Sequence, residues 1–105
     1  MAEHVVKGAD ARTGERGERL LARGERVALR EWAHEPAGET APEHENAYEY
    51  AGVVLEGGLR VSIRGAEPQE LRPGDSWCIP ARTQYSFEVL ETARVIEAVS
   101  PPDAL

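Results

Sequence analysis

The sequence predicts an all-β protein folded as one barrel or sandwich. Short apolar runs bounded by Gly, Pro or charged pairs dominate the chain, and few stretches carry a helical period. Several short strands with frequent turn signals between them are typical of all-β sandwiches and barrels. The 105 residues match the size of one domain, and no linker or low-complexity tract divides them. We therefore expect a single domain over residues 1–105, with an N-terminal extension at 1–18 and a barrel at 19–101.

The expected strands are short apolar runs that turn residues separate. They are Arg19–Ala22, Arg26–Trp32, Glu43–Tyr50, Gly52–Leu55, Leu59–Arg64, Ser76–Ile79, Tyr85–Leu90 and Arg94–Val99. The segments Leu55–Leu59 and Leu90–Arg94 predict hairpin connections between neighbouring strands. The segment Arg72–Asp75 predicts a tight turn, because its proline presets φ and its glycine supplies a positive φ.

Alternation of side chains in Glu43–Tyr50 separates the acids from the other polar groups. Successive side chains of a strand point to opposite faces. One face carries Glu43, Glu45, Ala47 and Glu49, and the other carries His44, Asn46, Tyr48 and Tyr50. Three carboxylates on the inner wall of a small barrel would each need a partner that the sequence does not supply. We therefore expect the glutamates in water and the other face inside, and the same alternation turns Tyr85 inward.

Two stretches keep a recognisable spacing. In the first, gaps of five, one, three and six residues separate Gly38, His44, Asn46, Tyr50 and Gly57. In the second, gaps of five and four residues separate Gly74, Pro80 and Tyr85, and 16 residues, 58–73, lie between the two stretches. This spacing resembles the two signature motifs of the cupin superfamily, G-x5-H-x-H-x3-E-x6-G and G-x5-P-x4-H. The resemblance covers most of 19–101 and implies a small single-domain cupin, an all-β double-stranded β-helix or jelly-roll barrel.

In cupins these motifs typically hold one divalent iron, manganese, nickel or zinc ion through three histidines and one glutamate. Here His44 alone keeps its ligand type, while Asn46, Tyr50 and Tyr85 occupy the other three positions. An amide is a weak ligand for transition metals, and a phenol must lose its proton, at a pKa near ~10, to coordinate well. The resemblance therefore implies a degenerate metal site, and no cofactor is expected. Placing Glu49 at the carboxylate position instead of Tyr50 would require a β-bulge.

The expected ligand-binding residues are His44, Asn46, Tyr50 and Tyr85. Two phenols offer flat apolar area with hydroxyl groups, and barrel mouths commonly carry small-molecule sites. We expect a small neutral or cationic organic ligand. Four alternatives stay open. The side chains plug the barrel, or a divalent ion serves a dioxygenase or isomerase through these unusual ligands. A metal-free enzyme could instead use His44 as acid or base and Tyr50 or Tyr85 as proton donor, or the protein could be a structural or regulatory subunit. The sequence does not decide whether the protein is an enzyme and assigns no catalytic residue.

Acidic side chains gather around the first stretch. Residues 31–59 contain seven acids and no Lys or Arg, so the whole formal net charge of −7 lies there. These acids either solvate a surface face or create a field that favours cations. No basic stripe is present, so nucleic-acid binding is not expected. No apolar run reaches the length of a membrane span and no apolar signal segment occurs, which predicts a cytoplasmic protein without membrane contact.

Two further expectations concern packing. Cupins commonly pair, so the resemblance implies a homodimer, with residues 1–18 as a candidate contact strand. Cys78 lies in an apolar run and is expected to be a buried, inert thiol.

Overall fold

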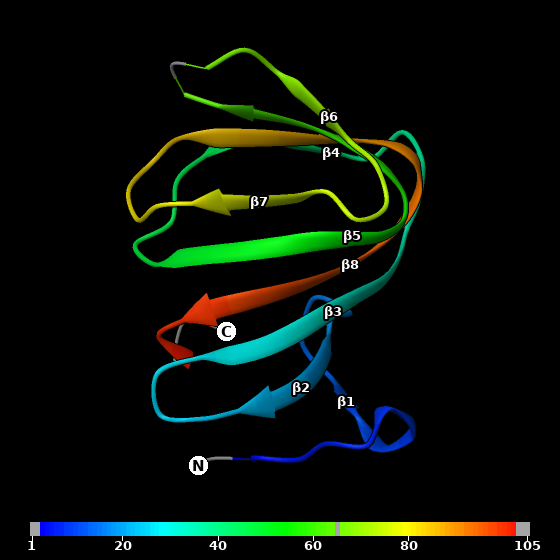
Figure 1. The fold of residues 1–105 in the computed structure, drawn as a ribbon, viewed down its shortest axis with the longest axis vertical. Coiled ribbons are helices and arrows are strands. Elements are labelled where there is room, and N and C mark those ends of the chain that lie inside the picture. The colour runs from blue at the N-terminus through cyan, green and yellow to red at the C-terminus, as the bar shows by residue number, and fades with distance from the viewer. Residues whose placement is uncertain (1–2, 65, 103–105) are drawn as a thin grey trace.

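The computed structural model describes residues 3–64 and 66–102, which form antiparallel β-strands in a jelly-roll arrangement (Figure 1). The strands are β1 (Arg12–Thr13), β2 (Arg19–Arg23), β3 (Ala28–Glu35), β4 (Thr40–His44), β5 (Glu49–Ile63), β6 (Gln69–Leu71), β7 (Ser76–Ile79) and β8 (Tyr85–Ser100). A short 3-10 helix, Gly8–Asp10, precedes β1. In the described residues, no helix is long and apolar enough to cross a membrane. The all-β prediction is confirmed.

Strands β5 and β8 form the spine of the fold, because they pair along nearly their whole lengths and both bend near the middle (Figure 1). The first half of β5 pairs with β7, and its second half pairs with β6. The first half of β8 pairs with β4, and its second half pairs with β3. Each long strand thus belongs to two walls, and the interior lies between them.

These bends show that the two predicted hairpins are wrong. The chain does not reverse at 55–59 or 90–94; the register between β5 and β8 instead shifts between residues 54 and 59. Gly57 has a φ of +79°, and a Cβ atom there would lie 2.1 Å from the carbonyl oxygen of Thr92. Only glycine allows two backbones to approach this closely in that conformation. Residues that usually form a turn therefore let β5 bend here without ending the strand.

The predicted strand Glu43–Tyr50 is also wrong as a single element. β4 ends at His44, a bend follows, and β5 begins at Glu49. The glutamates lie in water as expected, since Glu43, Glu45 and Glu49 are all exposed, but His44 on the face expected inside is exposed as well. Tyr50 is buried next to exposed Glu49, which excludes the alternative register with Glu49 inward.

Burial along β7 follows strict alternation. Trp77 and Ile79 are buried in the core, whereas Ser76 and Cys78 between them are exposed. The expectation of a buried Cys78 is therefore wrong, because the pleat turns it away from the interior. Gly52 lies opposite Trp77 on β5, and a Cβ atom at Gly52 would lie 2.5 Å from the indole ring. The missing side chain of Gly52 makes room for Trp77.

The remaining connections agree with the turn chemistry. Arg72–Asp75 is a tight turn, as predicted: the Asp75 amide donates to the Arg72 carbonyl at 2.8 Å, and Gly74 has a φ of +94°.

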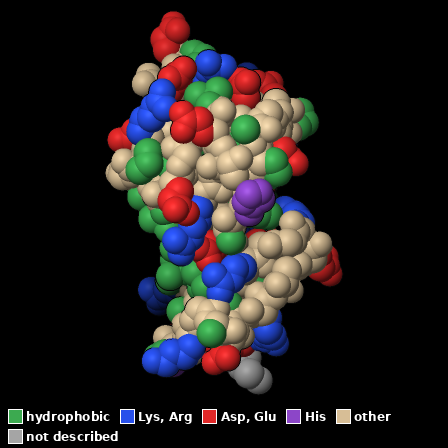
Figure 2. Space-filling view, turned by 90° about the vertical axis from the view of Figure 1, so that its right-hand side faces the viewer, with side chains coloured by type: hydrophobic (Ala, Val, Ile, Leu, Met, Phe, Trp, Pro, Cys, Tyr) green, Lys and Arg blue, Asp and Glu red, His purple; other side chains and the backbone are tan. Residues whose placement is uncertain are grey.

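Near the N-terminus, β1 pairs with β2 of the same chain. The homodimer and its contact through residues 1–18 stay predictions. Figure 2 shows acidic and basic side chains interspersed over one face of the molecule, with hydrophobic ones scattered between them.

Candidate ligand-binding cavity

A cavity of about 260 Å³ lies between the two walls of the fold. Its lining comes from β3, β4, β5, β7 and β8, from the loops on both sides of β4, and from Arg16 between β1 and β2. All four predicted site residues, His44, Asn46, Tyr50 and Tyr85, line it. The structure therefore brings the segment 44–50 together with the start of β8.

Tyr50 and Tyr85 are positioned by strand register. Tyr50 is the second residue of β5 and lies opposite Ile79 and Val99, while Tyr85 is the first residue of β8 and lies opposite Ile63. Both tyrosines are almost fully buried, and their ring centroids are 5.8 Å apart in a tilted arrangement. The two phenols thus form a rigid aromatic wall on which a flat ligand can pack.

Asn46 lies in the loop between β4 and β5, and two contacts hold it. Its carbonyl oxygen accepts a hydrogen bond from the Arg82 amide at 2.7 Å. Its side-chain Nδ2 donates to the Tyr85 hydroxyl, also at 2.7 Å. The amide is therefore fixed by the loop that precedes β8 and by Tyr85.

His44 lies at the exposed edge of the cavity, as the last residue of β4. Its ring centroid is 4.5 Å from that of Tyr85. His44 Nδ1 lies 2.9 Å from the Pro42 carbonyl oxygen, which requires the proton to sit on Nδ1. In the neutral ring, Nε2 is then left as a hydrogen-bond acceptor.

A buried ion pair, which sequence reasoning missed, forms another part of the wall. Arg30 Nε donates to Glu97 Oε1 at 2.6 Å, and Trp32 Nε1 donates to the same oxygen at 2.9 Å. The Arg30 guanidinium also lies 5.6 Å from the centroid of Trp32 and 5.7 Å from that of Tyr50, within cation–π range. One signal was present in the sequence, because strand alternation puts Arg30 on the same face as Trp32.

The ion pair sets the electrostatics of the interior. Burial by itself lowers the pKa of Arg30, but the charge and hydrogen bond of Glu97, with a further hydrogen bond to Tyr48, raise it overall. Burial raises the pKa of Tyr50 far above its ordinary value, and the Glu97 charge and the neighbouring Tyr85 hydroxyl raise it further. Both tyrosines are neutral at physiological pH, because burial raises the pKa of Tyr85 as well.

Two acidic side chains also border the cavity. Glu35 ends β3 and Glu39 follows in the next loop, and both border the cavity. Burial raises the pKa of Glu35, and the charges of Glu39 and Glu97 raise it further. Glu31 takes no part, because it is buried elsewhere and paired with Arg19 and Arg94. The acidic segment found in the sequence thus contributes two carboxylates to the cavity.

Comparison with known proteins identifies the fold family. The sequence profile of the family described as "Cupin domain" matches residues 31–99, well over half of the chain. The chain belongs to the cupin family. No curated protein matches the sequence significantly.

Several solved structures share this fold at low sequence identity. KdgF from Halomonas sp. is 24% identical, with a TM-score of 0.78 over 98% of this chain and 100% of its own. An RmlC-like cupin from Shewanella frigidimarina is 19% identical, with a TM-score of 0.84 over 99% of this chain and 97% of its own. Salicylate 1,2-dioxygenase from Pseudoaminobacter salicylatoxidans is 18% identical, with a TM-score of 0.67 over 75% of this chain but 21% of its own. Identities this low show a shared fold and nothing about a shared reaction.

The donor groups of this cupin do not fit the metal ion that the family commonly holds. Within residues 3–64 and 66–102, no three His, Cys, Asp or Glu side chains lie together in a way that could hold a metal. Of the four residues at the motif positions, His44 alone is a good ligand for a divalent transition metal. Tyr50 and Tyr85 resist deprotonation because both pKa values are raised. The Asn46 amide already donates to Tyr85.

Proposed function

We propose that this cupin binds a small neutral or cationic organic molecule in the cavity between its two walls, without the metal centre typical of the family. The observation that carries the proposal is the cavity itself. Its volume of about 260 Å³ is several times the roughly 30 Å³ share of one water molecule. It lies close to the lower end of the ~300–1,000 Å³ range of small-molecule pockets. The side chains therefore line a space, which argues against the alternative that they plug the barrel.

The chemistry of the wall supports an organic ligand. The lining combines aromatic rings with a few polar groups that converge on one space, and this combination is typical of small-molecule sites. The rings belong to Trp32, His44, Tyr48, Tyr50, Trp77, Tyr85 and Phe87. A compact ligand could pack against several of them at once, with about 0.5–1.5 kcal/mol per aromatic pair beyond area burial.

The charge of the wall favours neutral or cationic ligands over anions. Arg30 is neutralised by Glu97, which leaves Glu35, Glu39 and Arg16 as the remaining charged lining residues. A carboxylate ligand would lose its hydration next to two carboxylates, at a cost that Arg16 alone does not offset.

Ligand screening with a blocked cavity tests the proposal. Ala41 lies half-buried in the lining on β4, so Ala41→Phe should fill part of the space. Ala33 on β3 is exposed and outside the lining, so Ala33→Phe adds the same bulk elsewhere. We expect some members of a library of neutral and cationic metabolites to raise the melting temperature of the wild type and of Ala33→Phe, but not of Ala41→Phe. A library that stabilises none of them, or all three equally, would contradict the proposal.

A further inference from the structure

The hydrogen bond to Tyr85 runs in one direction. Asn46 Nδ2 carries only protons, so it must donate to the Tyr85 hydroxyl oxygen across their 2.7 Å contact. The Tyr50 ring packs beside Tyr85, with centroids 5.8 Å apart, but the two hydroxyls form no hydrogen bond of ordinary geometry. Tyr85 therefore accepts a hydrogen bond from Asn46, and its own proton is left to point elsewhere.

Trp77 does not take the Tyr85 proton. The indole N–H can only donate, and Trp77 Nε1 has no hydrogen-bond partner within the described part of the chain.

In residues 3–64 and 66–102, no acceptor takes the Tyr85 proton, because the hydroxyl is bonded only to the donor Asn46 Nδ2. The nearest ring neighbours are His44, Tyr50 and Phe87, with centroids 4.5, 5.8 and 5.5 Å from that of Tyr85. His44 offers Nε2 as an acceptor, but its ring is tilted by 51° against that of Tyr85 and forms no hydrogen bond with the hydroxyl. A hydroxyl that accepts a hydrogen bond becomes a stronger donor, because successive bonds polarise one another.

We propose that Tyr85 is the hydrogen-bond donor of this cavity and that it recognises an uncharged carbonyl oxygen on a flat ligand. This inference rests on the proposed function and adds the ligand class. A flat ligand fits because rings flank the hydroxyl on several sides. An uncharged oxygen fits because the lining already contains Glu35 and Glu39, which disfavour a carboxylate at the same place.

Two shape-matched probes test this proposal: acetophenone and α-methylstyrene. They differ in a carbonyl oxygen against a methylene group, so one accepts a hydrogen bond and the other does not. Dissociation constants are measured by NMR for the wild type and for Tyr85→Phe, which removes the hydroxyl and keeps the ring. The ratio of the two constants cancels the difference in hydrophobicity between the probes. The carbonyl ¹³C resonance of labelled acetophenone gives a second readout of hydrogen bonding.

We expect Tyr85→Phe to weaken acetophenone binding about three- to tenfold relative to α-methylstyrene, the value of one hydrogen bond. The carbonyl resonance of bound acetophenone should move downfield in the wild type and lose that shift in Tyr85→Phe. Tyr50→Phe should have a smaller effect, because Asn46 still donates to Tyr85. An unchanged ratio and an unchanged carbonyl resonance would overturn the role of Tyr85 alone. If neither probe binds the wild type, the proposed function fails together with this inference.

Discussion

Two Arg–Glu pairs of this cupin are built alike and lie on opposite sides of the same strand. Arg30 of β3 and Glu97 of β8 are directly opposite each other, as are Arg60 of β5 and Glu88 of β8. The contacts have nearly equal lengths, 2.6 Å for the first pair and 2.7 Å for the second. The side chains of the inner pair are only 7% and 8% exposed, whereas those of the outer pair are 41% and 44% exposed.

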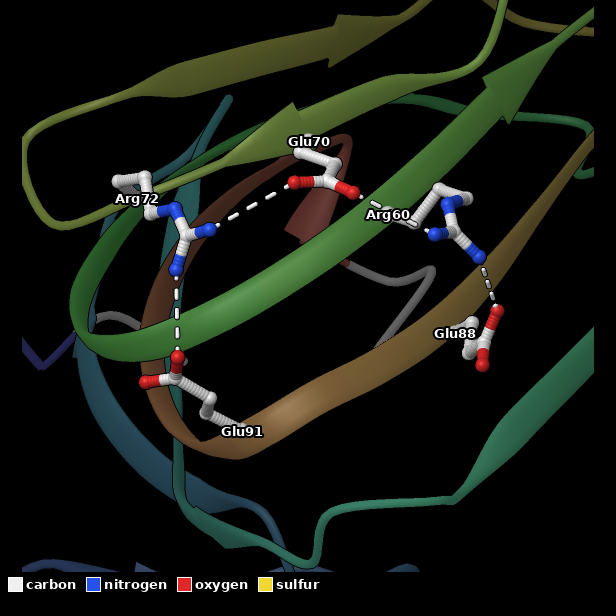
Figure 3. A network of polar contacts seen from close by, with 5 residues as sticks. All are labelled: Arg60, Glu70, Arg72, Glu88 and Glu91. Atoms are coloured by element: carbon white, nitrogen blue, oxygen red, sulfur yellow. Dashed lines mark hydrogen bonds and ion pairs between the residues drawn. The ribbon is translucent and has the colours of Figure 1, made fainter.

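The outer pair is part of a chain of exposed charges. Arg60 and Arg72 both contact Glu70, and each reaches one further acid, Glu88 and Glu91 respectively (Figure 3). Water competes for all five side chains, so each contact should add little to stability. In the inner pair, by contrast, each charge depends on the other and on Trp32. The comparison teaches that burial, and not contact distance, decides what such a pair contributes.

Removing one member of the inner pair should have the largest effect. Glu97→Ala leaves the Arg30 charge buried without a partner, which typically costs about 3–5 kcal/mol. Urea unfolding should show this loss in the free energy of unfolding. The matched outer variant, Glu88→Ala, should cost less than about 1 kcal/mol. Equal losses in the two variants would contradict the contrast between inside and outside.

An apolar replacement of both inner residues sharpens this prediction. The double variant Arg30→Met with Glu97→Leu removes both charges together. It should recover most of the stability that Glu97→Ala loses, since well-packed apolar residues often replace buried pairs at little cost. Failure to recover would mean that Arg30 or Glu97 stabilises the fold by packing and not through their charges.

A larger side chain should destabilise the protein more at Gly52, next to the core, than at Gly58. Gly52→Ala places a Cβ atom 2.5 Å from the Trp77 ring on the inner side, so the indole must shift. Overpacking of this kind typically costs about 1–3 kcal/mol. Gly58→Ala is the control, because its Cβ atom would be 3.5 Å from the Leu71 carbonyl oxygen, an ordinary contact. Thermal unfolding should rank Gly52→Ala well below Gly58→Ala, and the reverse order would contradict the assigned packing.

Salt should act only on the outer pair. The contribution of Arg60 and Glu88, about 0.2–1 kcal/mol at low salt, should fall towards zero near ~1 M salt, where the screening length is only about 3 Å. The loss caused by Glu97→Ala should hardly change, because solvent ions do not screen a buried pair well. Unfolding curves of both variants at low and high salt check this. A strong salt dependence of the Glu97→Ala loss would show that water reaches the inner pair.

The smallest expected effect concerns pH. The pKa of Glu35 is raised from its ordinary 4.5, mainly by burial and then by Glu39 and Glu97. The folded state therefore holds this proton more tightly than the unfolded chain, and stability falls as pH rises from about 4.5 through the raised pKa. Glu35→Gln should remove this fall and be slightly more stable than the wild type at neutral pH. Unfolding at several pH values tests the sign, and a wild type that gains stability from Glu35 over this window would contradict it.

Much of the fold and the site could be predicted from the sequence, because spacing and alternation are local signals. Motif spacing and strand alternation both predicted that Tyr50 and Tyr85 point inward, and both side chains are buried in the structure. Asn46 reaches the cavity for a different reason. It lies in a loop, where alternation does not apply, and the Arg82 amide and Tyr85 hold it there.

The errors have physical causes of two kinds. The segment around Gly57 contains residues typical of a hairpin turn. In the fold, however, Gly57 lets β5 bend where it passes close to β8, and this close approach cannot be seen from the sequence of β5 alone. Arg30 and Glu97 are charged residues in strands, and sequence reasoning expects charges in water. Their burial depends on a pairing across 67 positions of the chain, which no local pattern contains.

The most direct test of the cavity as a binding site uses the two tryptophans of the chain. Trp32 and Trp77 both line the cavity, and together they give two indole N–H signals in a ¹H–¹⁵N NMR spectrum. A titration with a compound that stabilises the wild type should shift both signals, and the shifts should disappear in Ala41→Phe. A compound that binds and stabilises the protein while leaving both indole signals in place would contradict the account.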